Sequence, residues 1–213
     1  MTTPVLYDYW RSSASYRVRI ALNLAGIAYQ PVVIDLLAGD HGSPEHLERN
    51  PLGKVPALDI DGVMLTQSLA IVEYLIETRG LALLPDEPAE RARVRALADV
   101  IAMDIHPICN LSVVAHVMEL TQGGDAVRVA WMQRFISQGL EAFEKLLGHP
   151  QTGTFCHGDT PGLADICLIP QLYNAERWGA DISGLRRIQA IRSACQALPA
   201  FANAHPDKCN NSA

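Results

Sequence analysis

The chain has 213 residues, of which 49% are hydrophobic and 19% are charged, enough for one large domain or two small ones with cores of their own. The formal net charge of −6 argues against nucleic acid as a partner, and it means that an anionic substrate must be drawn in by local basic side chains. The opening MTTPVLYDYW lacks the pattern of a secretory signal, and no stretch approaches the roughly 18 apolar residues that a membrane span needs. We therefore expect a soluble, cytoplasmic protein with no membrane partner.

The cysteines argue against disulfide and metal chemistry. They are odd in number and include no C-x-x-C pair: Cys109, Cys156, Cys167, Cys195 and Cys209. This pattern fits reduced thiols in a cytosol better than a disulfide framework or a zinc site. We therefore expect neither a bound metal nor a redox dithiol.

The start of the chain predicts a strand, a turn, a helix and a second strand. Residues 5–10 have a strand pattern, which Arg11-Ser12-Ser13 interrupts. Apolar residues then recur at helical spacing before Gly26, namely Val18, Ala21, Leu22 and Ala25. A second strand is expected over residues 29–36.

A hairpin and another helix are expected next. Residues 54–59 predict a third strand, and Asp61-Gly62 supplies the positive φ values that a tight turn into residues 63–65 needs. Gln67-Ser68 opens a helix over residues 69–78, which Gly80 closes. The order βαβ and then ββα, with an irregular stretch between, predicts a small α/β domain over residues 1–84.

The remainder of the chain predicts only helices. Prolines and acidic residues favour an extended linker over residues 84–88. Amphipathic patterns predict four helical segments, over residues 88–118, 126–147, 160–178 and 184–197. The third segment is expected to begin with a capping box, in which the Thr160 side chain accepts from a backbone N–H and Asp165 lies in the first turn. The polar tail over residues 204–213 is expected to fray.

The most informative feature for function is Ser12-Ser13, after a strand and at the start of a helix. Helix N-termini present unpaired N–H groups and a partial positive charge, so an anion belongs there. A lone serine is more often an N-cap, whereas two adjacent serines after Arg11 favour a functional site. A hydroxyl that donates to a bound thiolate lowers the pKa of that thiol. Because the first domain contains no cysteine, such a sulfur must come from a cofactor.

Two further features together describe a site for a small acidic tripeptide. If the Val55-Pro56 bond is cis, the Val55 backbone can turn outward and pair with an extended peptide. Taken alone, the same pair fits an ordinary loop proline. Gln67-Ser68 supplies a second helix N-terminus with a hydroxyl, which suits an α-carboxylate.

Several segments resemble the zeta-class glutathione transferases: SSASYRVRIALNLAG after YDYWR, NPLGKVPAL, DGVMLTQSLAIVEYL, NLSVV and NAERWGAD. The resemblance covers nearly the whole chain, and the set of motifs is highly specific. It implies the glutathione transferase fold, with a thioredoxin-like, glutathione-binding domain over residues 1–84 and an all-helical, substrate-binding domain over residues 88–213. It also implies a homodimer.

The same resemblance implies the residues that bind glutathione. From the sulfur to the γ-glutamyl end they are Ser12, Ser13, His41, Val55, Pro56, Gln67 and Ser68. Asp104 or His106 of the partner subunit is a further candidate to reach the cofactor. The alternative for these two residues is a solvated helix face with a kink at Pro107, and the sequence favours neither.

The activity implied within the family is cis–trans isomerisation of maleylacetoacetate to fumarylacetoacetate in the breakdown of aromatic amino acids. The thiolate of glutathione adds to the cis double bond, the resulting single bond rotates, and elimination gives the trans product. Ser12, Ser13 and Arg11 form the implied catalytic set. Arg11 and Arg177 match positions that hold the carboxylates of a dianionic substrate, and Asn110 can hydrogen-bond substrate or cofactor.

Two positions bear on the choice among related activities. Ala14 stands where several family members carry cysteine, so activity that needs a protein thiol there should be absent. Leu111-Ser112 stands where maleylpyruvate isomerases tend to have arginine, which favours maleylacetoacetate. The alternatives are maleylpyruvate isomerase and a transferase that acts on α-halo acids. From a different class, a non-catalytic interaction protein on the same fold is a further alternative.

Overall fold

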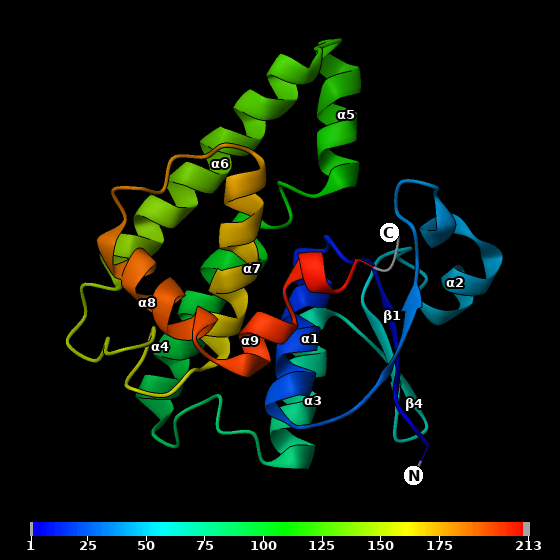
Figure 1. Ribbon diagram of the computed structural model, residues 1–213. Helices are drawn as coiled ribbons and strands as arrows, with labels where there is room; N and C mark the ends of the chain where they lie inside the picture. The colour runs from blue at the N-terminus through cyan, green and yellow to red at the C-terminus, as the bar shows by residue number, and fades with distance from the viewer. Residues whose placement is uncertain (1, 211–213) are drawn as a thin grey trace. The chain divides into compact units, whose positions relative to one another are not determined.

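The computed structural model in Figure 1 describes residues 2–210. These residues form two units, one made of the chain up to Ala82 together with the segment from Leu198 onward, and the other of Leu83–Ala197. The first unit contains all the strands, and the second is helical. The predicted order of an α/β part followed by helices is therefore confirmed.

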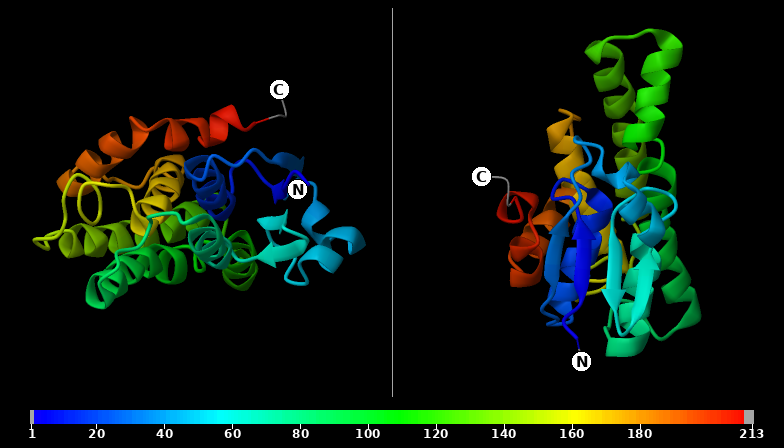
Figure 2. Two further views of the ribbon diagram at one scale, coloured as in Figure 1. Left: turned by 90° about the horizontal axis from the view of Figure 1, so that it is seen from below. Right: turned by 90° about the vertical axis from the view of Figure 1, so that its right-hand side faces the viewer.

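The first unit is built on a four-stranded sheet. Its strands are β1 (Val5–Asp8), β2 (Gln30–Val33), β3 (Ala57–Ile60) and β4 (Val63–Thr66). They lie side by side in the order β2-β1-β3-β4, as the right-hand view of Figure 2 shows. β1 is parallel to β2 and antiparallel to β3, so the central strand places Tyr7 between Val32 and Ala57. The hairpin predicted at Asp61-Gly62 is present, with φ values of 55° and 80°.

Helices cover both sides of this sheet. α1 (Ser13–Leu24) and α3 (Ser68–Arg79) lie on one side of the strands, and α2 (Pro44–Arg49) lies on the other, as Figure 1 shows. A short 3-10 helix, η1 (Asp40–Gly42), precedes α2. The irregular stretch that the sequence predicted between the second and third strands therefore contains two helical turns.

The end of the chain returns to the first unit. α9 (Pro199–Asn203) and the 3-10 helix η3 (Pro206–Lys208) follow the second unit, and α9 packs beside α1. The side chain of Asn23 donates to the Ala200 carbonyl at 2.9 Å, and Arg19 Nε donates to the Ala204 carbonyl at 3.1 Å. The expected second domain, 88–213, thus differs from the helical unit at its end. Fraying was wrongly predicted for residues 204–210, and residues 211–213 lie outside the described chain.

The second unit consists of five longer helices and one π-helical turn. The helices are α4 (Pro88–Asp99), α5 (Leu111–Thr121), α6 (Asp125–Leu146), α7 (Leu163–Arg177) and α8 (Arg186–Gln196). The π-helical turn η2 (Val100–Ile105) follows α4. The single helix predicted over residues 88–118 is wrong, because Pro107 has no N–H to continue the ladder and Asn110 caps a new helix. Within residues 2–210, no helix combines the length and apolarity needed to cross a membrane.

The buried helix α7 begins later than predicted. Its N-cap is Gly162, and Asp165 accepts from the Gly162 N–H at 2.8 Å and from the Cys156 N–H at 2.9 Å. Asp165 is buried, and this burial raises the pKa of its carboxyl. The capping box therefore uses Asp165 as predicted, whereas the predicted role of Thr160 is wrong because Thr160 precedes the helix by three residues.

Close packing of α6 on η2 requires glycine at position 139. A Cβ atom at Gly139 would lie 2.3 Å from both Cγ1 and Cδ1 of the buried Ile105. Distances this short are not tolerated without movement of the backbone or of the Ile105 side chain. Gly139 therefore sets how closely these two elements approach.

We predict that Gly139→Ala destabilises the second unit, although alanine is the better helix former. The steric overlap should cost about 1–3 kcal/mol, more than the ~1 kcal/mol that alanine gains in helix propensity. Urea unfolding followed by the fluorescence of Trp131 and Trp178 measures the change. In an Ile105→Ala background, where the overlap is removed, the same substitution should be neutral or stabilising. A destabilisation of equal size in both backgrounds would contradict the packing explanation.

Candidate functional site

The turn between β1 and α1 places Ser12 at the N-terminus of α1. Its backbone N–H donates to the Tyr9 carbonyl at 2.9 Å, and its side-chain oxygen accepts from the Ser15 N–H at 3.2 Å. Ser12 is therefore an N-cap, the structural role that the sequence left open. The role does not exclude function, because a hydroxyl that accepts through its oxygen can still donate its hydrogen. As the N-cap, the half-buried Ser12 lies at the positive end of α1.

The neighbours of Ser12 differ in exposure. Ser13 is the first residue of α1 and is only 7% exposed, so Ser12 is the more accessible of the two serines. The guanidinium of Arg11 stacks over the Trp10 ring at 4.3 Å from its centroid. Its buried Nε has no hydrogen-bond partner within residues 2–210. Arg11 therefore retains donor capacity beside the two serines.

Val55 is brought to the same turn by apolar packing. It belongs to a buried cluster with Tyr9 and Ile34, and Trp10 packs against this cluster. Because Tyr9 also accepts the Ser12 N–H, the loop before β3 and the start of α1 are held together through one residue. The Val55-Pro56 peptide bond is cis, the condition on which the predicted peptide-binding role depended.

The N-terminus of α3 combines a strained residue with a buried cation. Gln67 has φ +67°, unusual for a residue other than glycine, and such strain costs on the order of 1–3 kcal/mol. Ser68 is buried, and its oxygen accepts from Nη1 of Arg17 at 3.2 Å. Arg17 is only 2% exposed and lies on α1, so a positive charge lies beside the start of α3. This arrangement suits a carboxylate.

Sequence reasoning missed the contribution of Arg17. Arg17 and Arg19 stand among apolar residues in the segment YRVRIAL. A helix with one face in solvent carries its charged residues on that face and its apolar residues on the other, which this segment does not do. Both are buried, and each donates to a partner in another element. The signal available in the sequence was therefore two arginines inside an otherwise apolar helix.

His41 is held against the loop that leads to Val55. It lies in η1, and its buried Nδ1 has no hydrogen-bond partner in the described part of the chain. A Cβ atom at Gly53, which has φ +58°, would lie 3.0 Å from the His41 carbonyl oxygen. Glycine is thus favoured at position 53 both by its conformation and by this close approach.

The predicted residues of the second unit have less distinctive surroundings. Asp104 is exposed, and His106 is half-buried at the end of η2. Asn110 caps α5 and accepts from the N–H and hydroxyl of Ser112, both at 3.1 Å. Arg177 is the last residue of α7 and is exposed, with its guanidinium 6.0 Å from the centroid of the Trp178 ring. Their predicted roles remain predictions.

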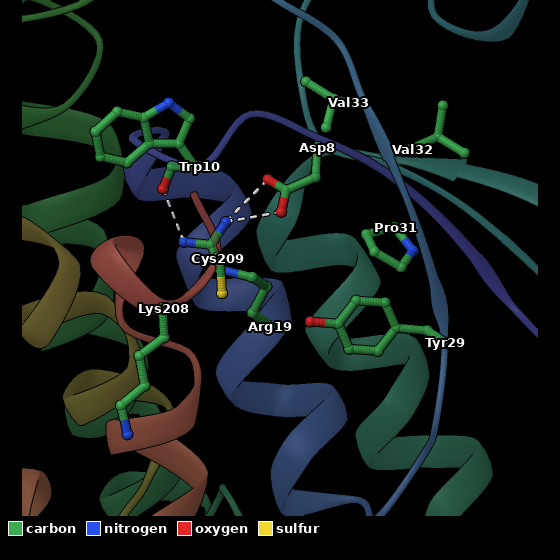
Figure 3. Close-up of a pocket in the computed structure, with 9 residues that line it drawn as sticks. All are labelled: Asp8, Trp10, Arg19, Tyr29, Pro31, Val32, Val33, Lys208 and Cys209. Carbon is green, nitrogen blue, oxygen red and sulfur yellow. Dashed lines mark hydrogen bonds and ion pairs between the residues drawn. The ribbon is translucent and has the colours of Figure 1, made fainter. Parts of the chain in front are cut away.

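A small cavity of about 160 Å³ in the first unit involves none of the predicted site residues (Figure 3). Its lining consists of Asp8, Trp10, Arg19, Tyr29, Pro31, Val32, Val33, Lys208 and Cys209. Arg19 donates from every guanidinium nitrogen, including to both Asp8 oxygens at 2.8 and 2.9 Å. Burial, helped by nearby Cys209 and Asp8, raises the pKa of Tyr29 to about 12, so the phenol stays protonated. The cavity therefore lies where Arg19 holds the C-terminal segment against the sheet.

The cysteines are free thiols with raised pKa values or buried positions. All five are free, and residues 1–108 contain none. Burial raises the pKa of Cys109 to about 11 and also raises the pKa of Cys156, Cys195 and Cys209. These thiols stay protonated near neutral pH. Among residues 2–210, no group of three or more His, Cys, Asp or Glu side chains could hold a metal ion.

Comparison with known proteins places the chain in a family. Residues 3–77 match the glutathione S-transferase N-terminal domain, and residues 129–203 match the glutathione S-transferase C-terminal domain. A maleylacetoacetate isomerase from Rhizobium meliloti is 62% identical over 205 residues, which cover 96% of each chain.

Two solved structures are also similar over nearly their whole length. One is a maleylpyruvate isomerase, described as a bacterial glutathione S-transferase of the zeta class, with TM-score 0.95, 40% identity and coverage of 98% of this chain and 100% of the other. The other is a maleylacetoacetate isomerase from Methylobacterium extorquens AM1 with bound malonate and glutathione, with TM-score 0.92, 44% identity and coverage of 96% and 97%. The expected thioredoxin-like and helical domains are those of this fold, and the chain belongs to the zeta class of the glutathione transferase family.

Proposed function

We propose that the chain is a glutathione-dependent cis–trans isomerase that converts maleylacetoacetate to fumarylacetoacetate in tyrosine and phenylalanine breakdown. The observation that carries the proposal is the 62% identity to the Rhizobium meliloti maleylacetoacetate isomerase over 96% of both chains. The apolar and neutral pair Leu111-Ser112 also supports it, since arginine is the residue expected there in a maleylpyruvate isomerase.

The first unit has the donors that a small acidic tripeptide needs. The oxygen of Ser12 accepts from Ser15, so its hydroxyl hydrogen is free to donate to the sulfur. Val55 packs against Tyr9, whose carbonyl accepts the Ser12 N–H, so Val55 and Ser12 are linked through Tyr9. Ser68 and the buried Arg17 provide a hydroxyl and a positive charge at the start of α3, where the γ-glutamyl carboxylate is expected. The residues present therefore fit glutathione.

Glutathione, when bound, supplies the thiol nucleophile that the reaction needs. The contribution of Ser12 is to donate a hydrogen bond to the sulfur, which favours its anionic form and lowers the thiol pKa. The dipole of α1 acts in the same direction and adds ~0.3–1 kcal/mol. Ser13 follows Ser12 at the start of α1 and is buried. Arg11 precedes Ser12 and contributes a guanidinium, which stacks on the Trp10 ring.

The substrate carries two carboxylates, and the acidic chain must attract them locally. Arg11 and Arg177 are the proposed partners, because a guanidinium can donate two parallel N–H groups to one carboxylate. Arg11 Nε has no partner within residues 2–210. Asn110 uses its side-chain oxygen to cap α5, so its amide N–H groups are the part proposed to meet substrate or cofactor.

A second candidate substrate is maleylpyruvate, a shorter diacid that would undergo the same chemistry. It is favoured by the similarity to the zeta-class maleylpyruvate isomerase, whose TM-score of 0.95 exceeds that of the maleylacetoacetate isomerase from Methylobacterium extorquens AM1. The ratio of kcat/KM for the two substrates separates the candidates. We expect the ratio to favour maleylacetoacetate.

The working form of the enzyme is proposed to be a cytoplasmic homodimer. Five free thiols suit a reducing compartment. Met103, next to Asp104, is an apolar side chain that is 62% exposed, which supports a contact with a second subunit at this position. In that contact Asp104 or His106 would approach the partner's cofactor. Sedimentation velocity measures the mass of the active species, and a fully active monomer would contradict this assembly.

The function is tested by following the isomerisation with and without added glutathione. Turnover should require glutathione and should survive alkylation of the protein cysteines, because the sulfur nucleophile belongs to the cofactor. The alkylated enzyme must be freed of excess reagent before glutathione is added. Full turnover in rigorously glutathione-free buffer would refute the proposal.

We predict that Ser12→Ala lowers kcat by about 10²–10³ and leaves the affinity for glutathione within a few fold, because the hydroxyl acts on the sulfur. Ser12→Asp separates this effect from helix capping. Aspartate keeps the capping acceptor but places a negative charge where the thiolate forms, so it should be inactive and still folded. Steady-state kinetics and calorimetric binding of glutathione make the comparison. If Ser13→Ala is crippling and Ser12→Ala is nearly silent, the roles of the two serines are reversed.

We predict that Arg177→Ala reduces kcat/KM for the dianionic substrate by roughly 30-fold or more, since losing a desolvated partner of a carboxylate costs ~2–5 kcal/mol. Glutathione binding should hardly change, and Arg177→Lys should recover only part of the loss. The matched control is Arg186→Ala, which removes another exposed arginine of the same unit. Turnover of the neutral electrophile chlorodinitrobenzene should be largely unaffected by Arg177→Ala. Equal losses on both substrates would mean that Arg177 is structural.

A further inference from the structure

Two buried side chains converge on one backbone carbonyl, that of Lys54. Nε2 of His46 lies 3.0 Å from this oxygen, and Nδ2 of Asn50 lies 2.8 Å from it. His46 is fully buried and Asn50 is 3% exposed. Because a carbonyl oxygen can only accept, Nε2 of His46 must carry the hydrogen. The Asn50 amide has a defined orientation, since its oxygen accepts from the Leu52 N–H at 3.2 Å.

These two bonds determine where the next N–H points. The Lys54 carbonyl and the Val55 N–H belong to one planar peptide unit, and this unit is trans because Val55-Pro56 is the cis bond in this segment. In a trans unit the C=O and the N–H point in opposite directions, so anchoring the oxygen aims the hydrogen. Two donors on the carbonyl also polarise the unit, which strengthens the N–H as a donor.

The N–H that is aimed in this way is not paired with any group of residues 2–210. None of the hydrogen bonds within residues 2–210 uses the Val55 N–H. Val55 nevertheless packs in the apolar cluster with Tyr9, beside the turn that carries Ser12. An oriented and unpaired backbone donor on a buried residue such as Val55 is rare in folded proteins, which indicates a ligand acceptor.

The anchor itself is stiff because its parts bond to one another. The Asn50 N–H donates to the His46 carbonyl at 2.8 Å, and the Gly53 N–H donates to the Asn50 carbonyl at 2.8 Å. Helix α2 has only six residues, too few to be stable alone. Its last turn is therefore held by the same contacts that hold the Lys54 carbonyl.

We propose that His46 and Asn50 are positioning residues for glutathione, which aim the Val55 N–H at a backbone carbonyl of the cofactor. The inference rests on the proposed function, because it takes glutathione as the ligand. Neither side chain touches the sulfur, which is served by Ser12. Their loss should therefore weaken binding of the peptide part of glutathione and spare turnover of the bound complex.

The first test is Asn50→Asp, which keeps the size of the side chain and the acceptor for Leu52 but removes the donor to Lys54. Its matched control is Asn23→Asp, which removes an amide-to-carbonyl bond of 2.9 Å to Ala200 in the same unit. Calorimetry measures the Kd of glutathione and of its thiol-free analogue γ-glutamyl-α-aminobutyryl-glycine. We expect Asn50→Asp to raise both values by about tenfold and Asn23→Asp to change them by less than about twofold. At saturating glutathione, kcat of Asn50→Asp should stay within about threefold of wild type.

The second test uses His46, where Gln and Met have similar size but only Gln can donate. His46→Gln can place its amide nitrogen near the position of Nε2 and should retain glutathione affinity within about threefold, whereas His46→Met should lose about tenfold. If one pair of variants does not fold, the other decides. Thermal melting of each variant separates loss of affinity from loss of stability.

Different results would overturn the positioning role of His46 and Asn50 and the proposed isomerase function. Equal changes in Kd for the Asn50 and Asn23 variants, or for His46→Gln and His46→Met, would overturn the positioning role. A fall in kcat at unchanged Kd would overturn it as well. If wild type binds glutathione but does not isomerise the diacid, only the proposed function falls. If wild type binds no glutathione, both fall.

Discussion

The interaction on which the first unit depends is the buried ion pair between Arg19 and Asp8. The Arg19 guanidinium makes further bonds in the same unit. It bonds to Asp8 at the end of β1, to the Trp10 carbonyl in the following turn, and to the Ala204 carbonyl near the end of the chain. Removing one partner of such a buried pair typically costs about 3–5 kcal/mol, because the other charge is left without compensation. The pair thus connects the strand, the turn and the helix that together position Ser12.

The chemistry is divided between backbone and side chains. In the proposed site, the peptide part of the cofactor meets groups whose positions the fold determines, namely the Val55 N–H and the start of α3. The sulfur meets one hydroxyl, that of Ser12, in the same proposal. The net charge of the chain is −6, so the proposed binding of an acidic ligand relies on local positive charges such as Arg17, which is almost completely buried. A buried charge is weakly screened and acts over a longer distance than one in solvent.

The sequence predicted those parts of the structure that have local signals. Ser12, Gln67 and the Asp61-Gly62 turn were placed correctly because caps and positive φ values depend on a few adjacent residues. It failed where the cause lies far along the chain. The short helix α2 depends on contacts with Lys54, and the ordered segment after Leu198 depends on Arg19 and Asn23. A kink at Pro107 was among the alternatives from sequence, whereas the π-helical turn η2, in which Ile105 meets Gly139 of α6, was not predicted.

The return of the C-terminal segment to α1 has a consequence for synthesis on the ribosome. The second unit, Leu83–Ala197, is in effect inserted into the first, which needs residues from both ends of the chain. The helical unit can therefore complete its own core while the α/β unit still lacks α9 and the acceptor at Ala204. During that interval Arg19 remains incompletely bonded, so the α/β unit matures last although most of it is translated first.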